Sequence, residues 1–382
     1  MRKYYHAKQI MLQSEMIEDA YLTIEDGKFV AVSTFKPSDG DIIDYGDAII
    51  APGLVDTHIH GYLGHDVMDN QTEGLDKISE GLLACGVTSW LPTTLTASVE
   101  ELSAVCQTIG QHYDRVKGAK IRGIFLEGPY FTEKYKGAQN PAYMGDPSIE
   151  QLTEWQELSN GLVKKIAIAP ERVGVEAFIK SATDQGIYTA LGHSDATYQQ
   201  AKTAVDAGAS IFVHTFNGMS GLHHREPGMV GAALNLEDVF AELICDGHHV
   251  HPAAAQIVKT MRGKNETVLI TDCMRAGGLG DGESSLGEFA VTVENGTARL
   301  KESGSLAGSI LELKQAVKNV VEWGIASPAE AIQMASLTPA KSVGVDYECG
   351  QIKVGLAADF IVLDPQMDLL ATYLDGELKY EA

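Results

Sequence analysis

The chain has 382 residues, of which 45% are hydrophobic, so it is long enough to bury a large core. Its formal net charge of −23 disfavours nucleic acids and anionic membranes as partners, because binding to them requires a positive field. The chain opens without a sustained apolar signal segment, lacks any apolar run of the ~18 residues that span a membrane, and has five scattered cysteines, which together predict a cytoplasmic protein with reduced thiols.

Both ends of the chain contain short alternating runs that are typical of β-strands. Residues 1–50 include YLTIEDGKFVAVS and DIIDYGDAII, and residues 345–382 continue in the same style. Asp-Gly pairs at 26–27 and 375–376 are turn signals between such runs. Neither end has enough strands to bury a core by itself, so we expect both ends to combine into one small, discontinuous β-sandwich domain.

The segment between the two ends, residues 51–344, alternates apolar runs with stretches of helical spacing. The eight apolar runs cover residues 54–60, 87–94, 121–129, 163–171, 187–194, 210–217, 241–249 and 267–274. Helical spacing with good helix formers occupies residues 73–86, 99–116, 175–186, 196–208 and 251–263. Because strands that alternate with helices form buried parallel sheets, the pattern predicts an α/β fold, a (β/α)8 barrel of about 250 residues. A doubly wound open sheet is the alternative.

After the eighth apolar run the pattern changes to a hairpin followed by helices. Residues 288–302 alternate in polarity around the turn pair Asn295-Gly296, which predicts a β-hairpin inserted into the barrel domain. Residues 303–324 begin as a loop of small residues and continue with helical spacing. A further helix is expected over residues 327–343.

Side chains of the kinds that bind metals occupy five of the eight predicted strand ends. His58 and His60 close the first strand, and they point the same way because alternate residues share a face of a strand. The third, fifth, sixth and eighth strands end in Glu127, His193, His214 and Asp272. The carboxyl ends of barrel strands meet at one rim, so we expect these six side chains to converge. Imidazole and carboxylate groups hold divalent ions in catalytic sites.

Each of these six positions also has an ordinary structural explanation. His58 and His60 could be hydrogen-bonded histidines at a strand end, and His193 could lie at the start of a helix. Glu127 could cap a helix or pair with a cation, and Asp272 could accept hydrogen bonds from a loop. No simple structural explanation covers all six together, so we expect a catalytic metal site.

Nine longer motifs extend along nearly the whole chain. They are PGLVDTHIHG (52–61), LEGPYF (126–131), KGAQNP (136–141), GHSDAT (192–197), HTFNGM (214–219), REPG (225–228), DGHHV (246–250), TDCMRAGG (271–278) and LAGSIL (306–311). These motifs resemble the N-acetylglucosamine-6-phosphate deacetylases of the amidohydrolase superfamily. The resemblance implies a metal-bearing barrel with a small β-domain. It also implies hydrolysis of N-acetyl-D-glucosamine 6-phosphate to D-glucosamine 6-phosphate and acetate in amino-sugar catabolism.

The resemblance implies a chemical role for each matching residue. Glu127, His193 and His214 match the main metal ligands, and Asp272 matches the catalytic acid and base. Some family members lack the His-x-His pair. Its presence here, as His58 and His60, implies a second metal position with Glu127 as the bridge. We therefore expect one or two divalent ions per chain, zinc or iron first, with manganese, cobalt or nickel as alternatives that the same ligands suit.

A second set of residues matches the substrate contacts of the family. This set comprises Ala138, Gln139, Asn217, Gly218, Arg225, His249, Leu306, Ala307 and Gly308. The resemblance implies that Arg225 and His249 face the sugar phosphate, and that Arg225 reaches the neighbouring subunit's site in a homodimer. Without the resemblance, Arg225 could equally form a surface ion pair with Glu226. Gln139 stands where some members have a histidine, and its amide can hydrogen-bond a sugar but cannot titrate.

Two other functions stay open at this point. A different amidohydrolase, acting on another N-acetylated amino-sugar phosphate or a cyclic amide, would share the metal site and differ at Asn217, Arg225 and His249. A non-catalytic barrel scaffold would normally have lost a metal ligand or Asp272, and this chain has lost none of them.

Overall fold

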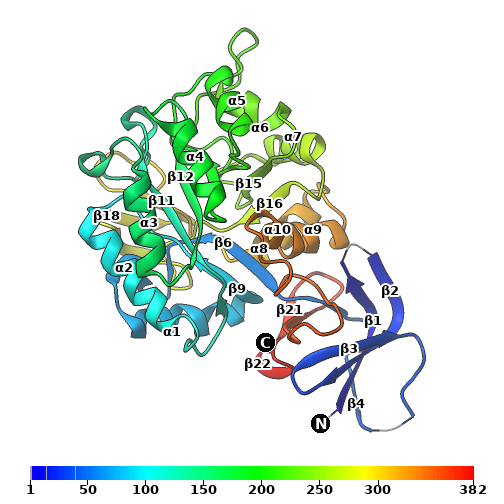
Figure 1. Ribbon diagram of the computed structural model, residues 1–382. Coiled ribbons are helices and arrows are strands. Elements are labelled where there is room, and N and C mark those ends of the chain that lie inside the picture. Colours follow the sequence, from blue (N-terminus) through cyan, green and yellow to red (C-terminus); the bar gives the residue numbers. More distant parts are fainter. Residues whose placement is uncertain (1, 14, 39) are drawn as a thin grey trace.

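The computed structural model describes residues 2–13, 15–38 and 40–382. Parallel strands and helices build the larger part of the molecule, and a smaller sheet combines strands from both ends of the chain (Figure 1). In the described ranges, no helix is both long enough and apolar enough to cross a membrane.

The smaller part is one sheet of eight strands. They are β1 (Arg2–Leu12), β2 (Glu15–Glu25), β3 (Lys28–Ser33), β4 (Ile42–Asp44), β5 (Ile49–Pro52), β20 (Phe360–Leu363), β21 (Leu369–Leu374) and β22 (Glu377–Glu381). Antiparallel pairing of β5 with β20 joins the two ends of the chain, and Figure 1 shows the blue and red strands lying together. The hydrogen bonds join all eight strands, so the predicted sandwich is not divided into two separate sheets. The bounds 1–50 plus 345–382 remain a prediction.

Each of the eight predicted apolar runs contains a parallel strand. The first two runs contain β6 (Leu54–Ile59) and β9 (Val87–Pro92), which pair with each other, and β10 (Lys120–Ile121) pairs with β9. The other six form a second sheet of β11 (Ile124–Tyr130), β12 (Val163–Ile168), β13 (Tyr188–Leu191), β14 (Ile211–Phe212), β15 (Phe240–Ile244) and β16 (Thr267–Ile270). Strand order follows chain order without a reversal, so the doubly wound alternative is wrong.

The two parallel sheets meet through one single bridge at each of their two junctions. Thr93 bridges Phe125 where β9 meets β11, and Ile59 bridges Cys273 where β6 meets β16. Beside the second bridge, the amide of Asp272 donates to the carbonyl of His58 at 2.8 Å. The first and eighth strands are therefore linked at the place where the predicted metal ligands lie.

Ten α-helices accompany the strands in the described part of the chain. They are α1 (Thr72–Leu82), α2 (Val99–His112), α3 (Ile149–Leu158), α4 (Val175–Asp184), α5 (Tyr198–Asp206), α6 (Gly228–Asn235), α7 (Pro252–Arg262), α8 (Leu313–Glu322), α9 (Pro328–Met334) and α10 (Leu337–Ser342). Capping boxes begin α2, α5 and α9 at Ser98, Thr197 and Ser327, which explains why these helices start there.

Two elements near the carboxyl end differ from the prediction. The predicted hairpin is β18 (Phe289–Glu294) with β19 (Thr297–Leu300), and β17 (Gly282–Leu286) adds a third strand whose polar sequence gave no signal. The single helix expected over 327–343 is two helices, α9 and α10, which break at Ala335 and Ser336. Pro339 explains the break, because a proline inside a continuous helix would clash with the carbonyl of Ala335.

Candidate metal centre

Glu127 lies at the centre of the converging strand ends. Its Oε1 is 3.1 Å from His214 Nε2 and 3.3 Å from His193 Nε2, and the two Nε2 atoms are 3.1 Å apart. The three side chains come from β11 and from the ends of β13 and β14, and all three are buried. Their ligand atoms lie close enough together to hold one metal ion.

His58 and His60 face the same carboxylate from the first strand. His58 Nε2 is 3.4 Å from Glu127 Oε1, and His60 Nε2 is 3.3 Å from Glu127 Oε2. Asp272 approaches from the eighth strand, with its Oδ1 3.1 Å from His60 Nε2 and 3.6 Å from His58 Nε2. Two further groups of three could hold an ion here, one with His58, His60 and Glu127 and one with His58, His214 and Asp272.

The other ring nitrogen of each histidine points outward to a hydrogen-bond acceptor. The Nδ1 partners are the Glu242 carboxylate for His58 (3.1 Å), the Thr93 carbonyl for His60 (3.2 Å), the Tyr135 carbonyl for His193 (2.8 Å) and the Asn217 carbonyl for His214 (3.1 Å). Carbonyl and ionised carboxylate groups accept but do not donate, so these contacts place a proton on each Nδ1. In a neutral imidazole each Nε2 then presents a lone pair to the centre, as in metal-binding histidines.

The donor set fits a divalent ion. Four nitrogen lone pairs and two carboxylates face one another at 3.1 to 3.6 Å, an arrangement that a cation between them would stabilise. In the part of the chain that the structure describes, His58 Nε2 is fully buried and has no hydrogen-bond partner. A buried polar atom without a partner is costly unless something binds it.

The charges of the centre also favour a cation. Burial opposes ionisation of Glu127, but His58, His193 and His214 outweigh it and hold the pKa of Glu127 well below its usual range. Burial likewise opposes ionisation of Asp272, whose pKa the neighbouring histidines lower. Burial disfavours the charged form of His58, yet Asp272 and Glu127 raise its pKa to about 9. Two ionised carboxylates in a buried site thus require positive charge.

Three of the converging residues have unusual backbone conformations. His193, His214 and Asp272 have φ values of 44°, 29° and 51°, in the left-handed region that residues other than glycine rarely adopt. Such strain costs roughly 1–3 kcal/mol per residue and collects at functional sites. Gly218 has φ 58°, and a Cβ on it would lie 2.9 Å from His193 Nδ1, so the close approach of this loop to the ligand requires glycine.

A cavity of about 140 Å³ opens above the centre. Its lining residues are His60, Leu95, Glu127, Gly137, Ala138, Gln139, His193, His214, Asn217, Gly218, His249, Asp272, Leu286, Leu306 and Gly308. Seven of the nine predicted substrate contacts are among them. Ala307 is instead buried in the hydrophobic cluster under β17 to β19, and Arg225 lies exposed on a loop with its guanidinium 2.8 Å from His224. His58 lies beneath the cavity and is fully buried.

Two of the predicted substrate contacts are held by neighbouring side chains. Gln139 Nε2 donates to Glu127 Oε2 at 2.6 Å, and Gln139 Oε1 accepts from the amide of Thr96 at 2.7 Å. Gln139 therefore orients the central carboxylate. His249 Nδ1 is 2.6 Å from Asp246 Oδ2, an arrangement that leaves His249 Nε2 as the nitrogen available to a ligand.

Sequence reasoning missed several residues of the site. Leu95 and Leu286 line the cavity but lie in none of the nine motifs, and Gly137 lies in KGAQNP without a side chain that would indicate a contact. Glu242 and Lys165 lie fully buried beneath His58. A signal for these two existed, because each is a charged residue inside a mostly apolar strand run.

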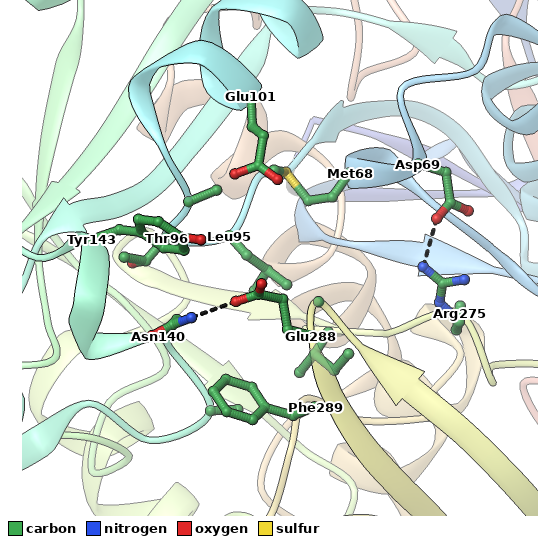
Figure 2. Close-up of a pocket in the computed structure, with 14 residues that line it drawn as sticks. Met68, Asp69, Leu95, Thr96, Glu101, Asn140, Tyr143, Arg275, Glu288 and Phe289 are labelled. Carbon is green, nitrogen blue, oxygen red and sulfur yellow. Dashed lines mark hydrogen bonds and ion pairs between the residues drawn. The ribbon is translucent and has the colours of Figure 1, made fainter.

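A second cavity, of about 220 Å³, adjoins the first and shares Leu95, Ala138 and Leu286 with it. Figure 2 shows carboxylates on several sides of this cavity, with Glu288 bonded to Asn140 and Asp69 paired with Arg275. Glu101 is the third carboxylate in its wall. Three carboxylates and one cation, Arg275, thus make this side acidic, whereas His249 lies in the wall of the first cavity.

The comparisons with known proteins agree with this geometry. The amidohydrolase family matches residues 49–379. The chain belongs to the amidohydrolase family. Its family resemblance, predicted from nine motifs, is thereby confirmed. The matched range contains every converging residue of the centre, and amidohydrolases are metal-dependent, which agrees with a donor set that fits a divalent ion.

Particular amidohydrolases are similar over their whole length. The chain is 40% identical over 381 residues to the N-acetylglucosamine-6-phosphate deacetylase of Vibrio furnissii, covering 99% of this chain and 95% of that one. It is 41% identical over 373 residues to the N-acetylgalactosamine-6-phosphate deacetylase of Escherichia coli O157:H7, covering 97% and 98%. A Mycobacterium smegmatis N-acetyl-D-glucosamine-6-phosphate deacetylase, an aspartate-to-alanine mutant in complex with N-acetyl-D-glucosamine-6-phosphate, matches with TM-score 0.94 at 30% identity over 99% of each chain.

Proposed function

We propose that this amidohydrolase removes the acetyl group of N-acetyl-D-glucosamine 6-phosphate, giving D-glucosamine 6-phosphate and acetate in amino-sugar catabolism. The observation that carries the proposal is the convergence of Glu127, His193 and His214 with Asp272 at the floor of a small cavity. The near full-length similarity to enzymes named for this reaction supports the choice of substrate. The intact donor set also argues against a non-catalytic scaffold.

The cofactor we propose is one or two divalent ions, zinc or iron first. Glu127, His193 and His214 would hold one ion, and His58 and His60 would share Glu127 with a second. When bound, a divalent ion lowers the pKa of a water molecule and polarises an amide carbonyl. Manganese, cobalt and nickel suit the same nitrogen and oxygen ligands.

Asp272 is the proton carrier in this proposal. It is ionised, it lines the cavity and its Oδ1 lies 3.1 Å from His60, so it is placed to accept the proton of an attacking water molecule. It then delivers that proton to the sugar nitrogen, because an amine leaves readily only when it is protonated. The remaining lining residues hold the sugar ring and exclude bulk water.

Phosphate recognition is assigned to His249 and Arg225. His249 is oriented by Asp246 and lies in the cavity wall. Arg225 lies exposed outside this cavity, so in this proposal it serves the site of the neighbouring subunit in a homodimer. Ala138, Gln139, Asn217, Gly218, Leu306 and Gly308 complete the proposed contacts, and Ala307 supports them from the core.

We also propose that the two parallel sheets act as one (β/α)8 barrel over residues 51–344, beside the discontinuous terminal domain. Support comes from the bridges between β9 and β11 and between β6 and β16, and from the parallel strand order. Such a barrel carries its chemistry at the carboxyl ends of the strands, where the metal centre lies.

Acetate release from three substrates tests the proposed function. We expect N-acetyl-D-glucosamine 6-phosphate to be cleaved with kcat/KM about 100-fold or more above unphosphorylated N-acetyl-D-glucosamine, because charge-assisted hydrogen bonds to a phosphate are each worth roughly 1.5–3 kcal/mol. Equal rates on these two would contradict phosphate recognition. The similarity to an N-acetylgalactosamine-6-phosphate deacetylase makes N-acetyl-D-galactosamine 6-phosphate the third substrate. If kcat/KM were higher on this C4 epimer than on N-acetyl-D-glucosamine 6-phosphate, the epimer would be the substrate and the proposed sugar would be wrong.

A further inference from the structure

A lysine and a glutamate form an ion pair in the interior, directly beneath the metal centre. Lys165 belongs to β12 and Glu242 to β15, and both side chains are fully buried. Lys165 Nζ donates to Glu242 Oε1, and it also lies 3.5 Å from the carbonyl of Thr57 and 3.7 Å from the centre of the Phe125 ring. The other oxygen, Glu242 Oε2, is 3.1 Å from His58 Nδ1.

Stability alone does not account for this pair. Removing two charges from water costs free energy that their attraction rarely exceeds, and well-packed apolar residues of similar volume are often as stable or more stable. The ammonium group of Lys165 offsets the charge of Glu242, so that the carboxylate can remain ionised without solvent. What the pair provides is an ionised acceptor fixed against one ring nitrogen of His58.

Only one of the four histidines of the metal centre has such a carboxylate behind it in the described part of the chain. In the described part of the chain, the Nδ1 atoms of His60, His193 and His214 face neutral backbone carbonyls, whereas that of His58 faces a carboxylate. A carboxylate behind a histidine fixes its tautomer and raises its basicity as a ligand, and the loss of such a partner typically weakens metal binding 10–100-fold. His58 belongs to the His-x-His pair, and Glu127, His193 and His214 form a metal-binding group without it.

We propose that Lys165 and Glu242 are positioning residues that control the second metal position through His58. The inference rests on the proposed metal-dependent function, but it concerns metal retention and not the chemical step. It predicts that loss of the pair weakens the ion shared by His58 and His60. The ion at Glu127, His193 and His214 should remain, because the carbonyls of Tyr135 and Asn217 orient those histidines independently.

Two double variants separate the effect of the two charges from the effect of the hydrogen-bond acceptor. Lys165→Met with Glu242→Leu removes both charges and the acceptor, while Lys165→Met with Glu242→Gln removes the charges and keeps an oxygen that can accept from His58. Each double variant keeps the net charge of the pair at zero. The control is Lys120→Met with Asp359→Asn, which removes a partly buried ion pair of 2.9 Å that contacts no histidine of the centre.

The experiment measures zinc per chain by elemental analysis after dialysis of apoprotein against a series of buffered Zn²⁺ concentrations. We expect two ions for the wild type and the control, and a 10–100-fold weaker second ion for the Met/Leu variant, with the first unchanged. The affinity of the Met/Gln variant for the second ion should lie between those of the wild type and the Met/Leu variant. If circular dichroism shows that the Met/Leu variant does not fold, the Met/Gln variant is used in its place.

Three outcomes would overturn the inference. They are two ions bound with wild-type affinity in the folded variants, equal loss of both ions, and a wild type that binds a single ion which the variants keep. Acetate release by the wild type is measured in parallel. A wild type that binds zinc but releases no acetate would contradict the proposed function without affecting the metal result.

Discussion

Asp272 has an uncommon backbone conformation and lines the cavity. Its φ of 51° places it in the left-handed region, and its backbone is fixed on both sides, since its amide donates to the His58 carbonyl at 2.8 Å and its carbonyl accepts from the Ser309 amide at 2.7 Å. These bonds fix the backbone position from which the carboxylate reaches His60 at 3.1 Å. This rigidity suits a group that must accept a proton and return it at a nearby atom.

Replacement of Asp272 with Asn tests this role. Asparagine keeps the shape of the side chain but cannot carry a proton, so kcat for acetate release should fall by about 10²- to 10⁴-fold. Zinc bound at Glu127, His193 and His214 should be retained, because Asp272 is not part of that group. Kinetics and elemental analysis on the same preparation check both statements. Near-normal turnover with the metal retained would show that another group carries the proton.

At the level of single residues, the sequence predicts the reactive side chains better than the groups that orient them. His58, Glu127, His193, His214 and Asp272 all stand at the ends of apolar runs, where the topology of a parallel sheet brings them together. Most of their supporting partners are backbone atoms, which the identity of a residue does not reveal. Three of the four outward acceptors are backbone carbonyls, those of Thr93, Tyr135 and Asn217, and their direction depends on how the chain turns after each strand.

Lys165 and Glu242 show a different limit of prediction. Lys164 and Lys165 are adjacent in the sequence, and only the strand's orientation decides that Lys165 is fully buried while Lys164 is partly exposed. The partnership of Lys165 with a residue 77 positions away depends on the curvature that brings β12 and β15 across from each other. Sequence alone can flag each charge as unusual, but it cannot pair them.

At the level of elements, the sequence predicts the positions of the strands better than their lengths. The run 210–217 reads as one strand, yet β14 covers only Ile211–Phe212. His214 and Phe216 follow with positive φ values of 29° and 83°, which end the strand and turn the ligand toward the centre. Apolar composition predicts such a strand, and it cannot reveal that the functional part of the run leaves the extended conformation.

The start of α9 offers a prediction about pH. Glu330 closes the capping box of α9 with Ser327 and forms an ion pair with Lys259 of α7 at 2.7 Å. Hydrogen bonds from Lys259 and from the Ser327 backbone lower the pKa of Glu330 from 4.5 to about 2. A lowered carboxyl pKa stabilises the fold fully above the unfolded-state value and loses this effect as the pH falls toward the folded-state value.

Glu330→Gln should therefore lower the thermal midpoint more at pH 7 than at pH 3.5. Glutamine still suits the capping box, so the loss is that of a partly exposed ion pair, about 0.5 kcal/mol at pH 7. The matched control is Glu101→Gln, at the same position of the α2 capping box, where the described residues provide no cation partner. Scanning calorimetry at pH 7, 5 and 3.5 measures the difference. If the difference in thermal midpoint between the wild type and Glu330→Gln stayed constant or grew toward acid pH, the result would contradict the lowered pKa of Glu330.

At the level of the whole molecule, charge decides which side of the site can receive a phosphate. The net charge is −23, and the cavity beside the metal centre is lined by Asp69, Glu101 and Glu288. An anionic substrate thus depends on a few local cations and hydrogen-bond donors. His249 is present in the wall of the cavity, whereas Arg225 lies outside it in the described chain. In the proposed homodimer, Arg225 of the neighbouring subunit would add a cation to this cavity, whose lining contains no lysine or arginine in the described part of the chain.

Mixing two inactive variants tests whether Arg225 acts across a dimer. In a homodimer of the proposed kind, each site combines Asp272 of its own chain with Arg225 of its neighbour. Asp272→Asn and Arg225→Ala should each be nearly inactive alone. Reversibly unfolded and refolded together in equal amounts, they should recover about one quarter of wild-type activity, because half of the dimers are mixed and each mixed dimer holds one complete site. If Arg225 instead served its own chain, no mixed dimer would contain a complete site, and activity would stay at the level of the separate variants.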